Sequence, residues 1–545
     1  MPHYNIPGFI KIPGNAGSAI EIPAIFLTMT FMDKIDLPSP TKVILAALVF
    51  LGVPLLYFIF LPVNYSFDGT VFSHFLRYAL IKHNLLDVVQ IHHLLYFPAN
   101  YLVYRVLETI FHYRVLEFFH LQLFSMFFGV MTLVLIERML KKLNLTLIMR
   151  LIGVAAVAFS YTFWLYAVDA EVHMAGVFFM VAGLYLLIFR ETRAYSLVWA
   201  ALCFALATGF HLTNILIAGT VLFYLLYQRV PWRRYVQFYL AYLSFMLILY
   251  GVYAAISHKP VQRILYNVFF GSDIYSGYKS TYFKSLALPT VISALASLKD
   301  ALVNKTGIWP WVLCAGFLAM LGMAFKGTDK SEIKTFKRAM LLWFTPFFLF
   351  FTFWDTANIE FKIHALVPLL LIAITSLDKL RPLVAHALGA SLVIGLLLIN
   401  LFSGIMPLTD VSKNTNYQVA LAIQKTTPAR AQILITGNFL GYGYGKIYIP
   451  YFALREVLIL DWLLGKGHSL SEIYAQLKKN AASGRPVYAL GEIAEMGKPM
   501  KNLLDFHHIK ESEYSRFNSG MRFILAAKLP GGYRLYRLEF ASPYE

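Results

Sequence analysis

Residues 43–62 read VILAALVFLGVPLLYFIFLP, and the polar string NYSFDGTVFSHFLRY follows at 64–78. The first stretch is long and apolar enough to cross a bilayer, because about 20 apolar residues span the hydrocarbon layer. Asp68 then lies within a turn or two of the point where this helix should leave the lipid. A carboxylate at that depth is either simply solvated or placed to act on a molecule held in the membrane.

The composition extends this interpretation to most of the chain. Hydrophobic residues make up 59% of the 545 residues and charged residues 14%, and the mean hydropathy is +0.62. Soluble chains have about a quarter of their residues charged. Since about 40 mixed residues precede the first apolar run, we expect no cleaved signal peptide. The sequence therefore predicts a polytopic α-helical membrane protein.

The apolar segments predict eleven spans. They lie at about 43–62, 118–136, 151–168, 172–189, 196–208, 214–228, 235–257, 307–325, 339–353, 365–378 and 383–403. Alternate connections are rich in Lys and Arg, which by the positive-inside rule places the N-terminus in the cytoplasm. With an odd number of spans, everything after residue 404 lies outside. Much of the net charge of +18 is then an orientation signal, and no nucleic-acid partner is expected.

These spans divide the chain into three predicted parts, a cytoplasmic segment (1–42), a membrane domain (43–404) and a soluble domain outside the membrane (405–545). The first outer loop, 63–117, predicts amphipathic helices along the membrane surface, and a second long outer loop covers 258–306. In the tail, SLSEIYAQLKKNAASG predicts a helix. Five stretches predict strands of a small α/β domain, namely AQILITG, REVLILDWLL, RPVYALGE, MRFILAAK and YRLYRLEF.

Four groups of polar residues fall on the outer side of this topology. The first is Asp68, and the second is Asp169 with Glu171 in YAVDAEVHMAG. The third and fourth groups are His211 with Asn214 in GFHLTN, and Asp355, Glu360, Lys362 and His364 in WDTANIEFKIH. Ionisable residues at membrane depth are costly and tend to be functional. We therefore expect one site at the outer leaflet.

Each group also has a plainer interpretation, which for WDTANIEFKIH is an ordinary polar turn. Asp68 before Gly69 is typical of a turn or helix cap, and Glu171 in a tight hairpin is often only solvated. His211 and Asn214 are residues that also pack helices together by hydrogen bonds. The pair His92–His93 does not predict zinc, because adjacent residues point to different faces and no third ligand is suitably spaced. No cofactor is expected, and a divalent metal stays open as an alternative that the ligand spacing does not support.

Four strings carry a resemblance to a known superfamily. FSYTFWLYAVDAEVHMAG, GFHLTN, HHLLYFPANYLVYR and NIEFKIH, with an acid after the first span, resemble the GT-C membrane glycosyltransferases. The likeness covers about residues 43–370 and is greatest to the protein O-mannosyltransferase branch and its bacterial relatives. HHLLYFPANYLVYR lacks most prolines of the family string, and NIEFKIH lacks the leading His-Lys of the H-K-E-x-R-F signature. The W-W-D-Y-G string of oligosaccharyltransferases is absent, which disfavours transfer of a whole glycan.

The resemblance implies transfer of a sugar from a polyprenyl phosphate to a hydroxyl of a lipid, glycan or protein. It places this reaction outside a bacterial inner membrane or an equivalent membrane. It assigns the catalytic base to Asp68, with Glu171 orienting the acceptor or sharing the proton. The leaving phosphate needs cations and hydrogen-bond donors, for which the candidates are Arg105, Lys362, His364 and His211. The expected substrate-binding residues are His92, His93, Asn214, Asp355, Glu360, Trp354 and Tyr65.

Other interpretations remain open at this point. A secondary transporter would favour internal repeats and polar residues near mid-bilayer, and a scaffold would use the soluble tail to bind a partner. A ligase that takes a lipid-pyrophosphate glycan is a further alternative. The string GNFLGYGYGK at 437–446 matches neither spacing of phosphate-binding glycine loops. It predicts a turn or an acceptor-binding loop.

Overall fold

The computed structural model describes residues 40–190, 194–258, 260, 262, 264, 287–304, 307–324, 330–441 and 443–540. The chain divides into two compact units, Met1–Ala47 and Leu48–Glu545, and the second contains every element from α2 onward. Most of the predicted cytoplasmic segment lies outside the described residues.

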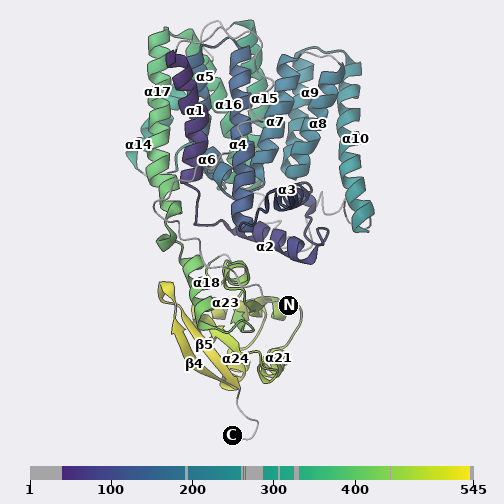
Figure 1. The fold of residues 1–545 in the computed structure, drawn as a ribbon, viewed down its shortest axis with the longest axis vertical. Coiled ribbons are helices and arrows are strands. Elements are labelled where there is room, and N and C mark those ends of the chain that lie inside the picture. Colours follow the sequence, from purple (N-terminus) through teal and green to yellow (C-terminus); the bar gives the residue numbers. More distant parts are fainter. Residues whose placement is uncertain are drawn as a thin grey trace. The chain divides into compact units, whose positions relative to one another are not determined.

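Apolar helices occupy all the predicted spans (Figure 1). Among the described residues, five helical stretches are long and apolar enough to cross a membrane, and a bent pair makes a sixth. The five are α4 (Glu117–Lys142), α10 (Trp232–Ser257), α15 (Ser331–Trp354), Glu360–Lys379 and Pro382–Thr409. The other predicted spans correspond to α1 (Pro40–Ile59), α7 (His173–Phe189), α8 (Ala194–Phe210), η3 (Leu212–Leu216) with α9 (Ile217–Tyr227), and α14 (Ile308–Met323). The protein is a multi-pass membrane protein.

The third predicted span is not one straight helix. It is divided into α5 (Leu147–Phe159) and α6 (Tyr161–Val168), which meet at an angle of 67°. Ser160 between them is extended, and its hydroxyl donates a hydrogen bond of 2.7 Å to the Val157 carbonyl. That bond ends α5, and α6 then runs to Asp169 in a new direction. The span predicted over 151–168 is therefore bent, and the prediction did not include the bend because no strong helix breaker marks it.

One helix forms the centre of the membrane part. Every residue of α16 (Ile363–Ser376) is buried, and it packs against α5, α14 and α15. The short helix η5 (Glu360–Lys362) leads directly into it. The next α-helix along the chain after α16 is α17 (Pro382–Ile399), which continues through η7 (Asn400–Ile405) and η8 (Met406–Thr409). Because α16 is enclosed, the polar residues at its start are held in a rigid setting.

The first outer loop contains helices, as predicted. They are α2 (Phe67–Lys82), η2 (Ile91–His93) and α3 (Tyr96–Phe111), and α2 packs against both α3 and α4. The second long loop contributes α13 (Leu288–Leu302). Residues 265–286 of that loop lie outside the described part.

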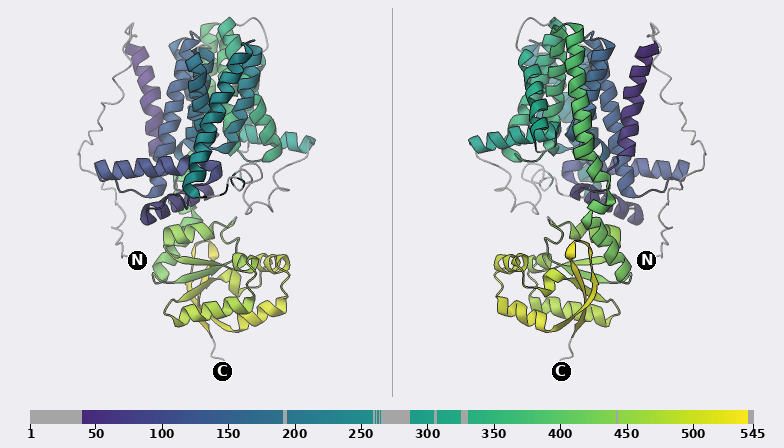
Figure 2. Two further views of the ribbon diagram at one scale, coloured as in Figure 1. Left: turned by 90° about the vertical axis from the view of Figure 1, so that its right-hand side faces the viewer. Right: turned by 90° about the vertical axis from the view of Figure 1, so that its left-hand side faces the viewer.

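The C-terminal part contains a five-stranded sheet of order β2-β1-β3-β5-β4 (Figure 2). Strands β1 (Gln432–Ile435), β2 (Glu456–Ile459) and β3 (Val487–Leu490) are parallel, and β5 (Arg534–Phe540) runs antiparallel to β3 and to β4 (Met521–Lys528). Side chains alternate across a strand, so Ile433 and Ile435 pack in a cluster with α18 (Thr415–Thr426). Leu434 packs on the other face with α21 (Leu470–Ala482), α23 (Lys498–Phe506) and α24 (Glu511–Ser519).

The tail predictions were correct except in one stretch. All five strands occur where the alternation indicated, and α21 begins at a capping box formed by Ser469 and Glu472. The stretch REVLILDWLL is only half strand, because β2 ends at Ile459 and α20 (Leu460–Gly465) follows at once. Asp461 stands in the first turn of α20, where an acid stabilises a helix.

The C-terminal part contacts the segment that begins α2. The Tyr448 hydroxyl donates to the Tyr65 carbonyl at 2.6 Å, and the Asn414 amide donates to the Val63 carbonyl at 2.8 Å. Arg77 donates to the Tyr451 carbonyl at 2.7 Å. These bonds hold the α/β part directly against the residues around Asp68.

Candidate active site

Asp68 lies in the first turn of α2. Ser66 caps this helix, since its hydroxyl accepts a hydrogen bond of 3.0 Å from the Gly69 N–H. A Cβ on Gly69 would come within 2.6 Å of the Ser66 Oγ and 3.2 Å of the Ala170 Cβ. Glycine is therefore what allows the start of α2 to approach the 169–171 segment so closely. The cap, expected as an alternative role of Asp68, is made by Ser66, which leaves the Asp68 carboxylate exposed.

Asp169 and Glu171 follow the end of α6 and are almost fully buried, each with 5% of its surface exposed. The Ser66 hydroxyl donates to Glu171 Oε1 at 3.1 Å, and the Ala170 N–H donates to Asp169 Oδ1 at 2.8 Å. The Ser125 hydroxyl donates to the Glu171 carbonyl at 3.0 Å, which fixes the turn. Among the described residues, Glu171 Oε2 has no hydrogen-bond partner. Glu171 is therefore not the merely solvated residue of the plainer interpretation.

Glu360 brings the third acid to the same place. Its carboxylate contacts His173 Nε2 and accepts a hydrogen bond of 3.3 Å from the Asn358 amide. Carboxylate oxygens of Asp68, Glu171 and Glu360 all lie within 4.8 Å of one another. Three acids that are far apart in the sequence thus share one site. Together with Asp169, two residues before Glu171, they form four residues that we call the acid cluster (Asp68, Asp169, Glu171 and Glu360).

Burial and mutual repulsion raise the pKa values of Asp68, Asp169 and Glu171, which lie outside the membrane-spanning helices. The pKa of Asp68 is raised to about 6, first by desolvation and then by the negative charge of Glu360, while His173 opposes the rise. Desolvation also raises the pKa of Asp169 to about 6. The pKa of Glu171 is raised well above its usual value by burial, with Glu360 and Asp68 adding to the shift. Like charges in a common site disfavour full ionisation, so the cluster is able to hold and exchange protons near neutral pH.

Buried histidines adjoin the acid cluster. The rings of His173 and His211 stack with centroids 4.9 Å apart, and His93 lies 4.9 Å from His211 in an edge contact. His364 is buried 6.1 Å from His173, and both of its ring nitrogens lack a partner in the described part of the chain. His211 Nδ1 contacts the Thr213 hydroxyl at 2.6 Å. His93, His211 and His364 were expected at the site, and the structure brings them together.

Two groups within this arrangement have the donor types that a cation needs. Ligand atoms of His173, His211 and Glu360 lie within 4.8 Å of one another, as do those of Asp68, Glu171 and Glu360. Imidazole and carboxylate suit zinc, and carboxylates alone suit magnesium or manganese. The spacing argument in the sequence missed both groups, because their members come from separate segments.

The predicted cations have partners of their own. The Lys362 ammonium is buried and donates to the Phe351 carbonyl at 3.2 Å. Arg105 forms an ion pair of 2.5 Å with Glu108 one turn further along α3. In the described part of the chain their bonds are to residues outside the acid cluster, so the structure places the histidines, and not Lys362 or Arg105, against the acids.

Other predicted substrate-binding residues have packing contacts. The Tyr65 ring lies 4.2 Å from Phe118 and stacks on Phe452 at 5.2 Å, inside the contact with the C-terminal part. The Asn214 amide donates to the Ala207 carbonyl at 2.9 Å and so links η3 to α8. The Trp354 ring stacks on Phe350 at 5.6 Å. These contacts favour the packing interpretation for Asn214.

The last two predicted residues lie at the margin. Asp355 ends α15, and burial raises its pKa while Asn358 opposes the shift. His92 is partly buried beside His93. Sequence reasoning missed two members of the site, His173 and Ser66. The signal for His173 was present in the string EVH, where it follows Glu171 by two positions.

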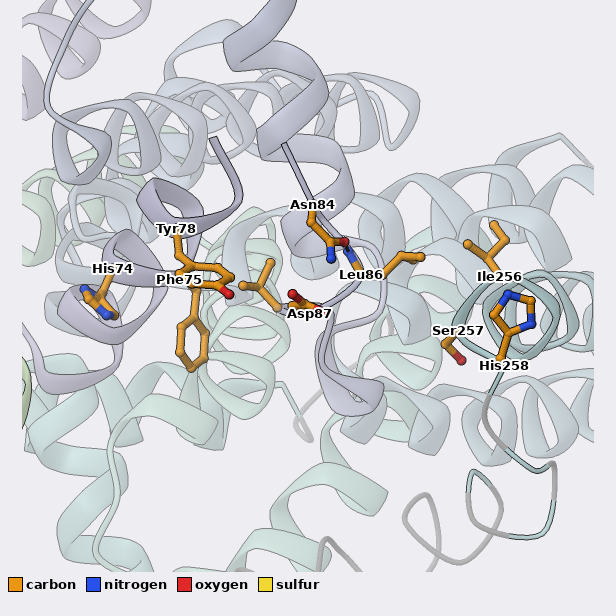
Figure 3. A pocket seen from close by; sticks show the side chains of 10 residues that line it. His74, Phe75, Tyr78, Asn84, Leu86, Asp87, Ile256, Ser257 and His258 are labelled. Atoms are coloured by element: carbon orange, nitrogen blue, oxygen red, sulfur yellow. Dashed lines mark hydrogen bonds between the residues drawn. The ribbon is translucent and has the colours of Figure 1, made fainter. Parts of the chain in front are cut away.

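A separate cavity of about 630 Å³ lies between α2 and the end of α10 (Figure 3). It is lined by His74, Phe75, Tyr78, Asn84, Leu86, Asp87, Val88, Ile256, Ser257 and His258. None of the predicted site residues lines it. The cavity is therefore distinct from the acid cluster, although both involve α2.

Comparisons with known proteins bear on the family and the fold. Residues 119–234 match the family described as "Protein O-mannosyl-transferase TMEM260 N-terminal domain". The fold is similar to that of ArnT from Cupriavidus metallidurans bound to undecaprenyl phosphate, with a TM-score of 0.60 and 11% identity. That likeness covers 92% of this chain and 98% of ArnT. Its apo state gives the same TM-score and identity, over 90% of this chain and 97% of that one.

A weaker likeness is to the arabinofuranosyltransferase AftD from Mycobacteria. The TM-score is 0.47 with 14% identity, covering 93% of this chain and 42% of that one. No curated protein matches the chain.

The bent and short helices, the helical first outer loop and the α/β tail define a membrane protein with a GT-C-like fold. Within that class, the match over 119–234 confirms the resemblance to the O-mannosyltransferase branch. The matched residues include Glu171, His173 and His211.

Proposed function

We propose that this protein is a membrane glycosyltransferase that moves one sugar from a polyprenyl-phosphate donor to an acceptor hydroxyl. The reaction takes place on the extracytoplasmic face. The observation that carries the proposal is the acid cluster, where carboxylate oxygens of Asp68, the buried Glu171 and the partly buried Glu360 lie within 4.8 Å of one another. ArnT binds undecaprenyl phosphate, and the matched family is described as mannosyl-transferring, which supports a lipid-phosphate donor and mannose as the first sugar to test.

Asp68 acts as the general base in this mechanism. Its carboxylate takes the proton of the acceptor hydroxyl while the acceptor oxygen forms a bond to C1 of the sugar. The bond between C1 and the phosphate oxygen breaks, and polyprenyl phosphate leaves with that electron pair. Attack opposite the leaving group inverts the configuration at C1. Asp68 suits this role because a base with a pKa of about 6 is deprotonated at pH 7 and still accepts protons readily.

The residues around Asp68 set its pKa and keep the site in a fixed arrangement. Burial, Glu360 and Asp169 keep the pKa of Asp68 high, and the Ser66 hydroxyl holds Glu171 in place. His173 counters the charge of Glu360. The leaving phosphate is a good leaving group that needs donors around it and no carboxylic acid to protonate it. His211, which has a ring nitrogen within 4.8 Å of a Glu360 carboxylate oxygen, is the first of the predicted donors, with Lys362, His364 and Arg105 as further candidates.

The experiment compares Asp68→Asn with the wild type and with Asp505→Asn, an exposed acid of α23. Purified protein in lipid is given undecaprenyl-phosphate mannose, and released undecaprenyl phosphate is measured with mass spectrometry of the products. We expect Asp68→Asn to lower turnover at least about 100-fold, the usual contribution of a general base. Asp505→Asn should behave like the wild type. Near-normal turnover by a folded Asp68→Asn protein would remove Asp68 as the base.

A further inference from the structure

The C-terminal sheet has a topological switch at the carboxyl end of β1. The chain leaves β1 for β2 on one side and then returns to β3 on the other side of β1. In open α/β sheets, ligands bind outside the carboxyl ends of the strands at such a point. After β1 the chain enters the glycine-rich string at 437–446, which matched no phosphate-binding spacing.

A carboxylate, or a residue hydrogen-bonded to one, follows the end of each parallel strand. After β1, the Thr436 N–H and hydroxyl donate to Glu492 Oε1 at 2.6 and 2.7 Å, and Glu492 itself follows β3. Asp461, just after β2, bonds His507 Nε2 at 2.7 Å and keeps 39% of its side chain exposed. A Cβ on Gly437 would lie 2.6 Å from Asp461 Oδ2. Only glycine therefore lets the β1 loop meet this carboxylate.

Aromatic rings and one lysine complete this edge. The Lys446 ammonium lies 5.4 Å from the centre of the Trp462 ring and 5.5 Å from the centre of the Phe67 ring. Trp462 is 52% exposed, which is unusual for so large an apolar ring in a region outside the membrane helices. The Tyr444 ring meets the Phe67 ring almost perpendicularly at 5.5 Å. We call Tyr444, Lys446, Asp461 and Trp462 the switch-point edge.

The switch-point edge adjoins the acid cluster through one residue. Phe67, which both Tyr444 and Lys446 contact, immediately precedes Asp68. The bond from Tyr448 to the Tyr65 carbonyl anchors the next turn of the same segment. A molecule bound at the edge is thus placed next to the carboxylate assigned to the acceptor proton.

We propose that the switch-point edge binds the carbohydrate part of the acceptor and presents its hydroxyl to Asp68. An exposed ring such as Trp462 packs against the apolar face of a sugar, as aromatic side chains do where one side is apolar and the other wet. The Asp461 carboxylate accepts, and the Lys446 ammonium donates, hydrogen bonds to sugar hydroxyls. This rests on the proposed function and narrows the acceptor from lipid, glycan or protein to a glycan.

Binding is tested with full-length protein in detergent, in an Asp68→Asn background so that no glycan is altered. The probe is a printed array of oligosaccharides that end in mannose, glucose or galactose. We expect Asp68→Asn protein to bind a subset of these, and the additional Trp462→Ala or Lys446→Ala to weaken that binding about 10-fold, which corresponds to 1.4 kcal/mol. Lys479→Ala, an exposed lysine of α21, is the matched control. Thermal unfolding shows that each variant is folded.

A second measurement separates this inference from the proposed function. In the active background, hydrolysis of undecaprenyl-phosphate mannose by water reports on the donor and the base alone. Trp462→Ala and Lys446→Ala should keep hydrolysis and lose transfer to the bound oligosaccharide. Absence of oligosaccharide binding, or equal loss of hydrolysis and transfer, overturns the inference while donor turnover by the wild type still supports the proposed function. If glycans bind at the edge but the wild type turns over no donor, the proposed function fails instead.

Discussion

Carboxylates lie both in the acid cluster and at the ends of the parallel strands beside the switch-point edge, but their hydrogen bonding differs. At the switch point, Glu492 accepts two hydrogen bonds from Thr436 and Asp461 is bonded to His507. In the acid cluster, Asp68, Glu171 and Glu360 approach within 4.8 Å and repel one another, and Glu171 Oε2 has no partner in the described part of the chain. Carboxylates whose oxygens have hydrogen-bond partners are suited to binding. Carboxylates that shift one another's pKa values are suited to proton transfer.

The largest expected effect comes from removing one charge in each place. Glu360→Gln should lower the turnover number about 100-fold, because Glu360 is the member that the acids and the histidines share, and losing one preorganised charge is costly. Glu492→Gln should stay within about threefold of the wild type, because the amide oxygen still accepts from Thr436. Steady-state kinetics with undecaprenyl-phosphate mannose measures both. Equal losses would mean that the two places do not differ in the way described.

The next expected effect concerns the two predicted phosphate contacts. Lys362→Ala should raise the donor KM about 10-fold, since a charge-assisted hydrogen bond contributes roughly 1.5–3 kcal/mol, and should leave the acceptor KM unchanged. Arg105→Ala should change the donor KM less than about threefold, because Arg105 is partly exposed and already paired with Glu108. Titrations of donor and acceptor measure the two constants separately. A larger effect for Arg105 would reverse this order.

The sequence predicted which acids and histidine belong to the site better than it predicted which side chains contact them. Asp68, Glu171, His211 and Glu360 stood out because charged or histidine side chains are rare among apolar spans and all lay on one side of the topology. That argument depends only on hydropathy and the bias of cations between loops. It could not place Lys362 or Arg105, because which neighbour a long side chain meets depends on three-dimensional packing. The same limit applies to Tyr65, whose aromatic partners come from the C-terminal part.

His173 and the bend at Ser160 show the limit in another way. His173 begins an apolar helix and differs little in pattern from a buried core histidine, although it contacts Glu360. Ser160 breaks the third span with a local side-chain bond that hydropathy does not register. The sheet was easier to predict, because short apolar runs such as β1 and β3, which are buried along their whole length, keep their signal within a few residues.

His173→Ala should shift the pH dependence rather than abolish activity. His173 lowers the pKa of Asp68, so its removal should raise that pKa above about 6. The base must be deprotonated to act, so the rate rises with pH through this pKa. In the variant, the acidic limb should move to higher pH by roughly half to one unit. The pH–rate profile measures the shift, with His386→Ala on α17 as the control. A shift to lower pH, or none, would contradict the contact between His173 and the acid cluster.

The smallest expected effect is that of metal removal. The acid cluster contains donors of the types that cations bind, yet its charge is also reduced by protonation of carboxyls with raised pKa values and by the contact of His173 with Glu360. A lipid monophosphate that leaves C1 of the sugar needs hydrogen-bond donors, which the histidines supply. Turnover after dialysis against EDTA and 1,10-phenanthroline should therefore stay within about twofold of the untreated rate, since no charge that the reaction uses is removed. A loss restored by added Mn²⁺, Mg²⁺ or Zn²⁺ would instead make a cation the counter-charge of the cluster, and the comparison with the switch-point edge would then rest on the metal rather than on protons.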